Sequence, residues 1–142
     1  MERTLFIVKP DAMERNMAGQ ILAHVEGAGF RLVHVRLANL TRAQAEGFYA
    51  EHKERPFFGD LVAYMTSGPV LLTTLERDDA VKKLREVVGA TDPAQAAEGT
   101  VRKKFGIDKQ RNSVHASDSP ASADREIRFF FDRELATDAT RA

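Results

Sequence analysis

The chain has 142 residues, 21 basic and 21 acidic side chains, and no cysteine. The zero net charge argues against a protein that binds mainly through a global positive field, and the lack of cysteine excludes disulfides and thiol chemistry. The length predicts a single domain over residues 1–142. We expect a cytoplasmic protein, because the N-terminus shows no signal-peptide core and no apolar run approaches membrane-spanning length.

Hydrophobic periodicity predicts strands and helices in alternation. The expected strands, in which apolar residues run together or alternate, span residues 5–8, 31–40, 70–75 and 112–115. The expected helices, in which apolar residues recur every three or four positions or a capping signal occurs, span residues 13–28, 41–52, 58–65, 78–88, 100–105 and 120–131. Two strand–helix–strand units predict a mixed α/β fold, more specifically one of the α+β type. The expected fold is a ferredoxin-like split βαβ sandwich, a four-stranded antiparallel sheet with helices packed on one face.

The second strand alternates apolar and polar side chains, which is typical of a strand with one buried face. We therefore expect Val33, Val35 and Leu37 to face the core, and His34 and Arg36 to face solvent.

Two segments have weak periodicity. Residues 89–111 form a long stretch that is not of low complexity, so we expect a functional loop that contains the short helix at 100–105. The polar tail from Asp132 onward is expected to be frayed or packed on a neighbouring subunit.

The most informative segment is residues 112–119, Asn-Ser-Val-His-Ala-Ser-Asp-Ser. It places His115 at the end of an extended stretch, and Ser119 followed by Pro120 predicts a helix start. The free N–H groups of that helix would point back toward His115, where an anion is favoured. An unprotonated ring nitrogen is a nucleophile, so the layout predicts a phosphate at His115. A packed or solvated side chain is the alternative for any histidine, and three others fit it: His24, His34 and His52.

This octapeptide and the segment Phe-Ile-Val-Lys-Pro-Asp at residues 6–11 resemble nucleoside diphosphate kinases. The family signature Asn-x-x-His, then Gly or Ala, then Ser-Asp is complete in its Ala form, and the resemblance runs from about Glu2 to Phe131. It implies the ferredoxin-like fold. It also implies ping-pong transfer of the γ-phosphate from a nucleoside triphosphate to a nucleoside diphosphate through a phosphohistidine at His115.

The resemblance also implies roles for four residues near His115. Glu126 would hold the histidine ring by a hydrogen bond, Ser117 would link this network to the leaving phosphate oxygen, and Tyr49 would lie near the histidine. Lys9 would bind the γ-phosphate and a sugar hydroxyl. The residues alone leave alternatives: Glu126 could reach solvent, Lys9 could merely terminate a strand, and Tyr49 could pack against its helix.

Further matching positions would hold the nucleotide. They are Arg85, Thr91 and Arg102 for the phosphates, Asn112 for the ribose, and Phe57 with Leu61 for the base. The polar ones are surface residues by default. Phe57 and Phe58 could both belong to the core, but we expect Phe58 to be core and Phe57 to be exposed at the cleft. On the other side of the base the family often has an apolar residue, whereas this chain has Lys109. Mg²⁺ is expected to arrive with the nucleotide, with Asp118 as an indirect contact through water.

Family members are tetramers or hexamers built from similar dimers, so the resemblance implies a homo-oligomer in which residues 89–99 pack at subunit contacts of the hexamer. The expected small-molecule partners are nucleoside di- and triphosphates, without membrane or nucleic acid. The basic segment 102–111 suggests one alternative, a nucleic-acid-binding or regulatory module without turnover. A small metabolite-binding domain is another. The presence of His115, Lys9 and Glu126 argues against the first, and the second would not need the His-Ala-Ser-Asp sequence.

Overall fold

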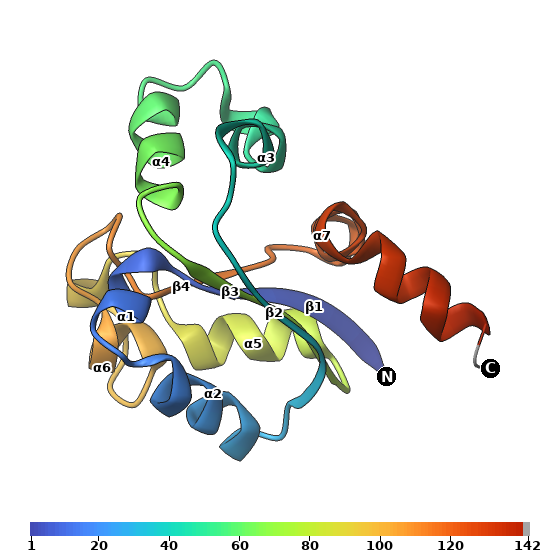
Figure 1. Ribbon diagram of the computed structural model, residues 1–142. Helices are drawn as coiled ribbons and strands as arrows, with labels where there is room; N and C mark the ends of the chain where they lie inside the picture. The colour runs from blue at the N-terminus through green and yellow to red at the C-terminus, as the bar shows by residue number, and fades with distance from the viewer. Residues whose placement is uncertain (141–142) are drawn as a thin grey trace.

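Four strands form one antiparallel sheet in the computed structural model, which describes residues 1–140 (Figure 1). The strands are Glu2–Val8 (β1), Arg31–Ala38 (β2), Val70–Arg77 (β3) and Val114–Ala116 (β4). Their order in the sheet is β2-β3-β1-β4, and each neighbouring pair is antiparallel. This confirms the ferredoxin-like α+β fold that the sequence predicts.

The helices connect and cover the strands. They are Pro10–Glu14 (α1), Ala18–Gly27 (α2), Arg42–Phe48 (α3), Phe58–Met65 (α4), Ala80–Val88 (α5), Val101–Phe105 (α6) and Pro120–Thr140 (α7), with short 3-10 turns at Ala50–His52 (η1) and Pro93–Gln95 (η2). The prediction of one helix over residues 13–28 is wrong, because Asn16 has a left-handed φ of 58° that separates α1 from α2. The capping box at Thr41 is confirmed, but α3 ends at Phe48 and tightens into η1.

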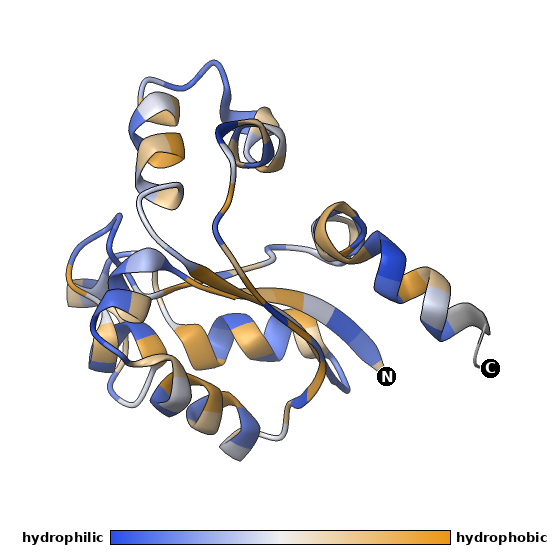
Figure 2. Cartoon of the chain, in the orientation of Figure 1, coloured by the Kyte–Doolittle hydropathy of each residue, from blue (hydrophilic) through white to orange (hydrophobic). Residues whose placement is uncertain are grey.

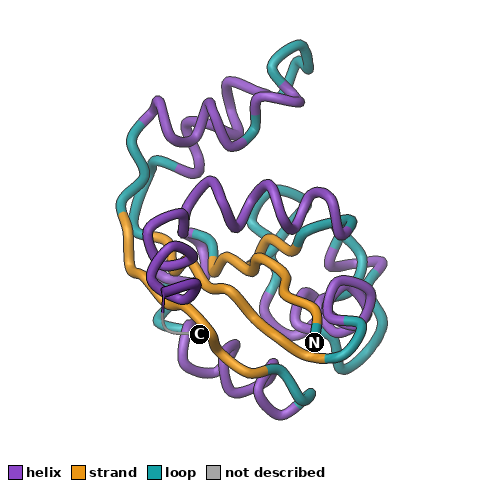
Figure 3. Tube along the Cα trace, turned by 90° about the vertical axis from the view of Figure 1, so that its right-hand side faces the viewer, coloured by secondary structure: helices purple, strands orange, loops and turns teal. Residues whose placement is uncertain are grey.

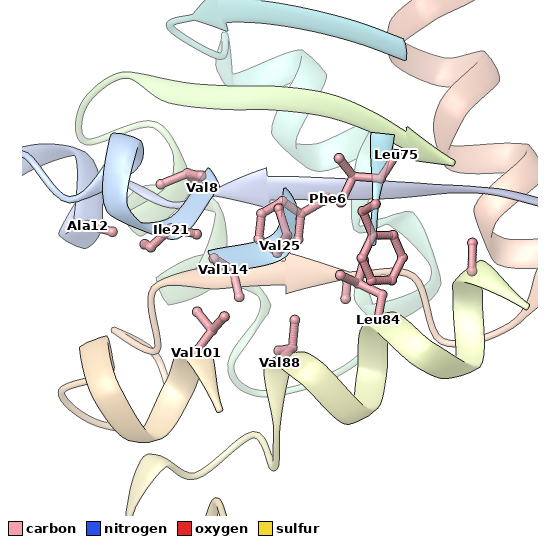
Figure 4. Close-up of a cluster of buried hydrophobic side chains, with 13 residues drawn as sticks. Phe6, Val8, Ala12, Ile21, Val25, Leu75, Leu84, Val88, Val101 and Val114 are labelled. Atoms are coloured by element: carbon pink, nitrogen blue, oxygen red, sulfur yellow. The ribbon is translucent and has the colours of Figure 1, made fainter. Parts of the chain in front are cut away.

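Helices cover both faces of the sheet, so the prediction that they cover one face is wrong (Figure 3). The reason lies in β1, which is the inner strand next to β4. Phe6 and Val8 point into a core formed with α2, α5 and α6 (Figure 4), whereas Leu5 and Ile7 point into a second core with α4 and α7. All four side chains are 0% exposed, which explains the unbroken apolar run at residues 5–8.

The face of β2 that is buried is the one predicted to face solvent. Val35 and Leu37 are 51% and 63% exposed, whereas His34 is buried. The pairing of β2 with β3 shifts by one residue at Val33, between Leu32 and His34. A one-residue bulge turns every later side chain to the other face, so His34 comes to lie against α7. Figure 2 shows the central part of the sheet as predominantly apolar.

The tail from Asp132 onward continues α7 past a kink at Phe131, whose φ and ψ are −120° and 29°. The prediction of a frayed tail is therefore wrong for residues 132–140. Its polar side chains pair with the chain's own β2: Arg36 lies 2.8 Å from Glu134, and His34 Nε2 lies 2.8 Å from Asp138. None of the helices within residues 1–140 combines the length and the apolar composition needed to cross a membrane.

Candidate active site

His115 lies on β4, at one edge of the sheet, and its ring is held by α7. Its Nε2 is 2.8 Å from Oε1 of Glu126, and the same oxygen accepts a hydrogen bond of 2.7 Å from the hydroxyl of Ser117. A carboxylate can only accept, so this contact favours the ring form in which Nε2 carries the hydrogen. Nδ1 then carries the lone pair, as a nucleophile requires.

The start of α7 places Glu126 behind the histidine. Ser119 caps the helix, accepting the Ser122 N–H at 3.1 Å, as predicted. Glu126 is buried, together with the predicted apolar residues of this helix: Ala123, Ile127, Phe130 and Phe131. Ser117 is completely buried beside Glu126 and does not line the cleft in front of His115. The structure therefore brings Ser117 to the carboxylate and not to the space where a phosphate would bind.

A cleft of about 430 Å³ opens in front of the ring. Nine predicted site residues line it: Lys9, Tyr49, Arg85, Thr91, Arg102, Asn112, His115, Asp118 and Glu126. They come from β4, α5, α6, α7 and the segments between elements, including Lys9 directly after β1, so the fold gathers segments that are far apart in the sequence (Figure 1). We call this space the His115 cleft.

A second space of about 450 Å³ adjoins it, here called the outer hollow. Its lining is Lys9, Phe57, Leu61, Thr91, Lys109 and Gln110, and it shares Lys9, Thr91 and Lys109 with the His115 cleft. Phe57 is 49% exposed, whereas Phe58 packs against the second core, which confirms the distinction that we predicted between them. The two spaces together provide an apolar end and a basic end.

Lys9 is buried at the junction of the two spaces. Its Nζ donates a hydrogen bond of 2.9 Å to Oδ1 of Asn112. Burial, and then the charge of Arg102, lower the pKa of this ammonium to about 8, whereas Asp11 and Asp108 oppose the shift. An anion bound beside Lys9 would restore part of the lost solvation and favour its charged form.

Two arginines on the cleft wall are held by main-chain carbonyls. Arg102 donates to the oxygens of Gly89 and Val114 at 3.1 and 3.0 Å, and Arg85 donates to that of Ala116 at 3.4 Å. Burial and the charge of Arg85 lower the pKa of Arg102 to about 10. Neither arginine has an ion-pair partner among residues 1–140, and Nε of Arg102 is buried without a hydrogen-bond partner there. This uncompensated positive charge favours an anion in the cleft.

The backbone before His115 is strained. Ser113 is fully buried with φ of 76°, and the Val114 N–H bonds to the Asn112 carbonyl at 3.0 Å, which makes a γ-turn. The Ser113 carbonyl accepts the Lys9 N–H at 2.8 Å. This turn lies between Asn112 and His115, and its carbonyl binds the backbone of Lys9. Strained backbone of this kind often occurs at functional sites.

Several cleft residues were not predicted: Phe48, Glu51, His52, Ser122 and Arg125. The Phe48 ring meets the His115 ring edge-on, with centroids 5.2 Å apart and planes at 74°. Helical spacing could have found Ser122, which precedes Glu126 by one turn on α7. No comparable signal marks His52, because its place depends on the turn η1.

Asp118 lies at the exposed rim of the His115 cleft. A hydrogen bond from Ser122, followed by the charges of Arg85 and His115, lowers the pKa of this carboxyl. Within residues 1–140 no group of three or more histidines or carboxylates could hold a metal ion. The donor set therefore fits a cation held mainly by phosphate oxygens and water, and not one held in a protein cage.

The nucleoside diphosphate kinase profile matches residues 2–135 of the chain. The chain belongs to the nucleoside diphosphate kinase family. Members of this family are phosphotransferases.

Curated relatives and solved structures agree with this family. A nucleoside diphosphate kinase of Sorangium cellulosum is 56% identical over 141 residues, covering 99% of this chain and 98% of that protein. The structure of the Aquifex aeolicus nucleoside diphosphate kinase matches with a TM-score of 0.90 and 48% identity, covering 92% of this chain and 94% of that one. That of Halobacterium salinarum, solved in complex with CDP, matches with a TM-score of 0.89 and 40% identity, covering 92% and 88%.

Proposed function

We propose that residues 1–142 act as one nucleoside diphosphate kinase domain that transfers the γ-phosphate by way of phospho-His115. Nδ1 of His115 attacks the γ-phosphorus, the bond to the β-phosphate oxygen breaks, and the nucleoside diphosphate leaves. A second diphosphate then attacks the phosphohistidine and takes the phosphoryl group. The observation that carries this proposal is the 2.8 Å contact between Nε2 and Glu126, which leaves the lone pair on Nδ1 of a histidine that lines the basic cleft.

The cleft cations have the charge that phosphoryl transfer requires. Lys9, Arg85 and Arg102 would bind the phosphates and neutralise the charge of the transition state, and Thr91 would add a hydroxyl. Tyr49 is buried beside Glu126, and burial followed by the charge of that carboxylate raises its pKa, so it would act as a neutral phenol.

The nucleoside would extend from the cleft into the outer hollow. The ribose would meet Asn112, whose amide already donates to the carbonyls of Thr91 and Lys109 at 3.0 and 2.9 Å. Mg²⁺, bridging phosphate oxygens and contacting Asp118 through water, would withdraw charge from the transferring group.

Brief incubation with γ-labelled ATP tests the proposed intermediate. The protein should become labelled, and the label should be lost in acid and retained in base, as expected of a phosphohistidine. Adding unlabelled nucleoside diphosphate should then transfer the label to it. A label stable in acid, or no labelled protein under conditions of rapid turnover, would contradict the proposal.

Phe57 is expected to provide the stacking surface for the base, because its ring is half-exposed in the outer hollow. Phe57→Ala should weaken every nucleotide by a similar factor, corresponding to about 1–3 kcal/mol of binding free energy. Equilibrium binding of purine and pyrimidine diphosphates measures this effect, with the exposed Phe129→Ala on α7 as a control. A loss confined to purines would instead indicate hydrogen-bond recognition of the base.

The lowered pKa of Lys9 predicts a pH effect on binding. Since the ammonium titrates at about 8 in the free protein, kcat/KM for the triphosphate should fall above pH 8 by up to about tenfold per unit. Lys9→Arg, which stays charged, should lose this basic limb even if its activity is lower.

The same shift has the opposite consequence for folding. Between pH 8 and 10.5 the unfolded chain holds the Lys9 proton more tightly than the folded one, so this residue makes the free energy of unfolding rise with pH. Urea denaturation of the wild type and Lys9→Met at several pH values isolates its contribution. Parallel curves for the two proteins would contradict the assigned pKa.

We propose that the chain forms a homo-oligomer, either a tetramer or a hexamer. Val35 and Leu37 expose apolar surface on the edge strand β2, and this supports a subunit contact. In the loop 89–99, Pro93 is buried and packs closely against Gly106. If Gly106 carried a side chain, its Cβ atom would lie only 2.5 Å from the proline ring.

Sedimentation of the wild type should therefore give the mass of four or six subunits. Pro93→Ser should lower urea stability mainly by loosening the assembly, because it restores backbone freedom to this loop. A single-subunit mass for the wild type, or identical unfolding of both proteins, would contradict this proposal.

We place the enzyme in the cytoplasm, where nucleotide pools are its substrates and where a chain without cysteine needs no oxidising environment. The geometry gives no support to nucleic-acid binding by the segment 102–111. Arg102 points into the His115 cleft, and Arg111 is paired with Asp108 at 2.7 Å. Fewer of its charges are therefore available to a phosphate backbone than the sequence suggests.

A further inference from the structure

The corner between β1 and α1 carries a buried carboxylate that the proposed reaction does not use. The side chain of Asp11 is 3% exposed. One of its oxygens accepts a hydrogen bond from the hydroxyl of Tyr64, and the other lies 3.0 Å from Nη2 of Arg15. The Tyr64 hydroxyl in turn accepts the Asp11 N–H at 3.2 Å. A buried carboxylate with this many partners fixes their relative positions.

Tyr64 belongs to the same face of α4 as the residues of the outer hollow. It follows Leu61 by three positions and Phe57 by seven, and these spacings place all three side chains on one side of a helix. Phe57 and Leu61 line the outer hollow, and Nζ of Lys9 lies 5.8 Å from the centroid of the Tyr64 ring. One helix face thus meets both the outer hollow and the Lys9 corner.

Helix α4 is part of an arm, residues 42–65, that stands out from the sheet (Figures 1 and 3). The bond between Tyr64 and Asp11 joins this arm to the corner where β1 ends. A weaker contact of 3.4 Å, from the Gln110 amide to the Asp60 carbonyl, joins it to an exposed loop. Tyr49 and Met65 also anchor the arm in the second core, and the bond between Tyr64 and Asp11 adds a buried side-chain hydrogen bond between α4 and the corner next to Lys9.

We infer that Asp11 and Tyr64 are positioning residues that hold the outer hollow at a fixed distance from Lys9. This inference rests on the proposed function, because a nucleotide must reach from its base in the hollow to its phosphates at Lys9. Asp11 lines neither space, so it acts through Tyr64 and Lys9.

Asp11 also acts on Lys9 through its charge. Around the ammonium, Arg102 from α6 opposes protonation, whereas Asp11 from α1 and Asp108 from the following loop favour it. Tyr64 from α4 is a neutral neighbour, since burial and the bond to Asp11 raise its pKa. Loss of the Asp11 charge should therefore make Lys9 easier to deprotonate, which a purely structural role would not do.

Tyr64→Phe tests the positioning role, because it keeps the ring and removes the hydroxyl. KM for all nucleotides should rise by about tenfold, the loss expected for one hydrogen bond to a charged group, while kcat changes little. Labelling of His115 by phosphoramidate, a phosphoryl donor without base or sugar, should proceed at the wild-type rate. Equal slowing with ATP and phosphoramidate, or an unchanged KM, would overturn the inference.

Asp11→Asn tests the charge independently. The basic limb of the kcat/KM profile should move to lower pH by about half a unit to one unit. Asp124→Asn, which removes an exposed carboxylate paired with Arg128 on α7, is the matched control and should leave the limb in place. If the basic limb of the kcat/KM profile does not move in Asp11→Asn, the electrostatic part of the inference is wrong.

The wild type separates this inference from the proposed function. If the wild type is not labelled by ATP, the proposed function itself is wrong. If the wild type is labelled normally and both variants behave like it, the proposed function stands and the positioning role of Asp11 and Tyr64 is wrong.

Discussion

Replacing His115 with asparagine should abolish phosphotransfer while the chain still folds and binds nucleotide. Asparagine has a similar shape but no nucleophilic ring nitrogen. His52, the other histidine that lines the cleft, lacks the carboxylate contact within residues 1–140 that holds the His115 ring, so we do not expect it to replace His115. We expect the single-turnover rate of labelling from γ-labelled ATP to fall on the order of 10⁴-fold or more.

Equilibrium binding of a nucleoside diphosphate and thermal unfolding should remain close to wild type in this variant. His24→Asn on α2 is the control, because His24 lies outside both the His115 cleft and the outer hollow. Normal labelling of His115→Asn would show that another residue accepts the phosphate.

Glu126→Gln should slow the chemical step by about ten- to a hundredfold without abolishing it. The amide can still accept the Nε2 hydrogen, but the negative charge that stabilises the ring during attack is lost. Ser117, whose hydroxyl now donates to the carboxylate at 2.7 Å, could also compete for the amide oxygen.

Rapid-quench measurement of phospho-His115 formation separates this effect from binding, and KM should change little. Glu134→Gln provides the control on the same helix, since Glu134 pairs with Arg36 beyond the kink. Equal rates for wild type and Glu126→Gln would mean that the contact with His115 has no part in the reaction.

Much of the fold follows from local patterns. The apolar run at residues 5–8 predicted a strand, and Ser119 before Pro120 predicted the start of α7, because both depend on neighbouring residues alone. The gathering of the nine cleft residues could not follow from such patterns. It came from the family resemblance, whose motif blocks are far apart in the sequence and meet in the structure.

The errors arose where one residue changes the geometry of a whole segment. The left-handed Asn16 divides the helix expected over residues 13–28, and the bulge at Val33 turns His34 inward and Leu37 outward. Neither position is glycine, so neither carries the usual sequence signal. Burial of His34 also depends on a distant ring, since it stacks on Phe131 with centroids 5.2 Å apart.

The shared position of β1 between the two cores bears on how the chain unfolds. Phe6 and Val8 pack in one core, and Leu5 and Ile7 pack in the other. Unfolding of the helices on either face of the sheet would therefore expose apolar side chains of the same strand. The arm of residues 42–65 lacks such double support and can open locally at a lower free energy than the sheet. His115, the proposed nucleophile, is therefore anchored to β1 through the pairing of β4 with β1, whereas Phe57, the proposed base surface, belongs to the arm that we expect to open more readily.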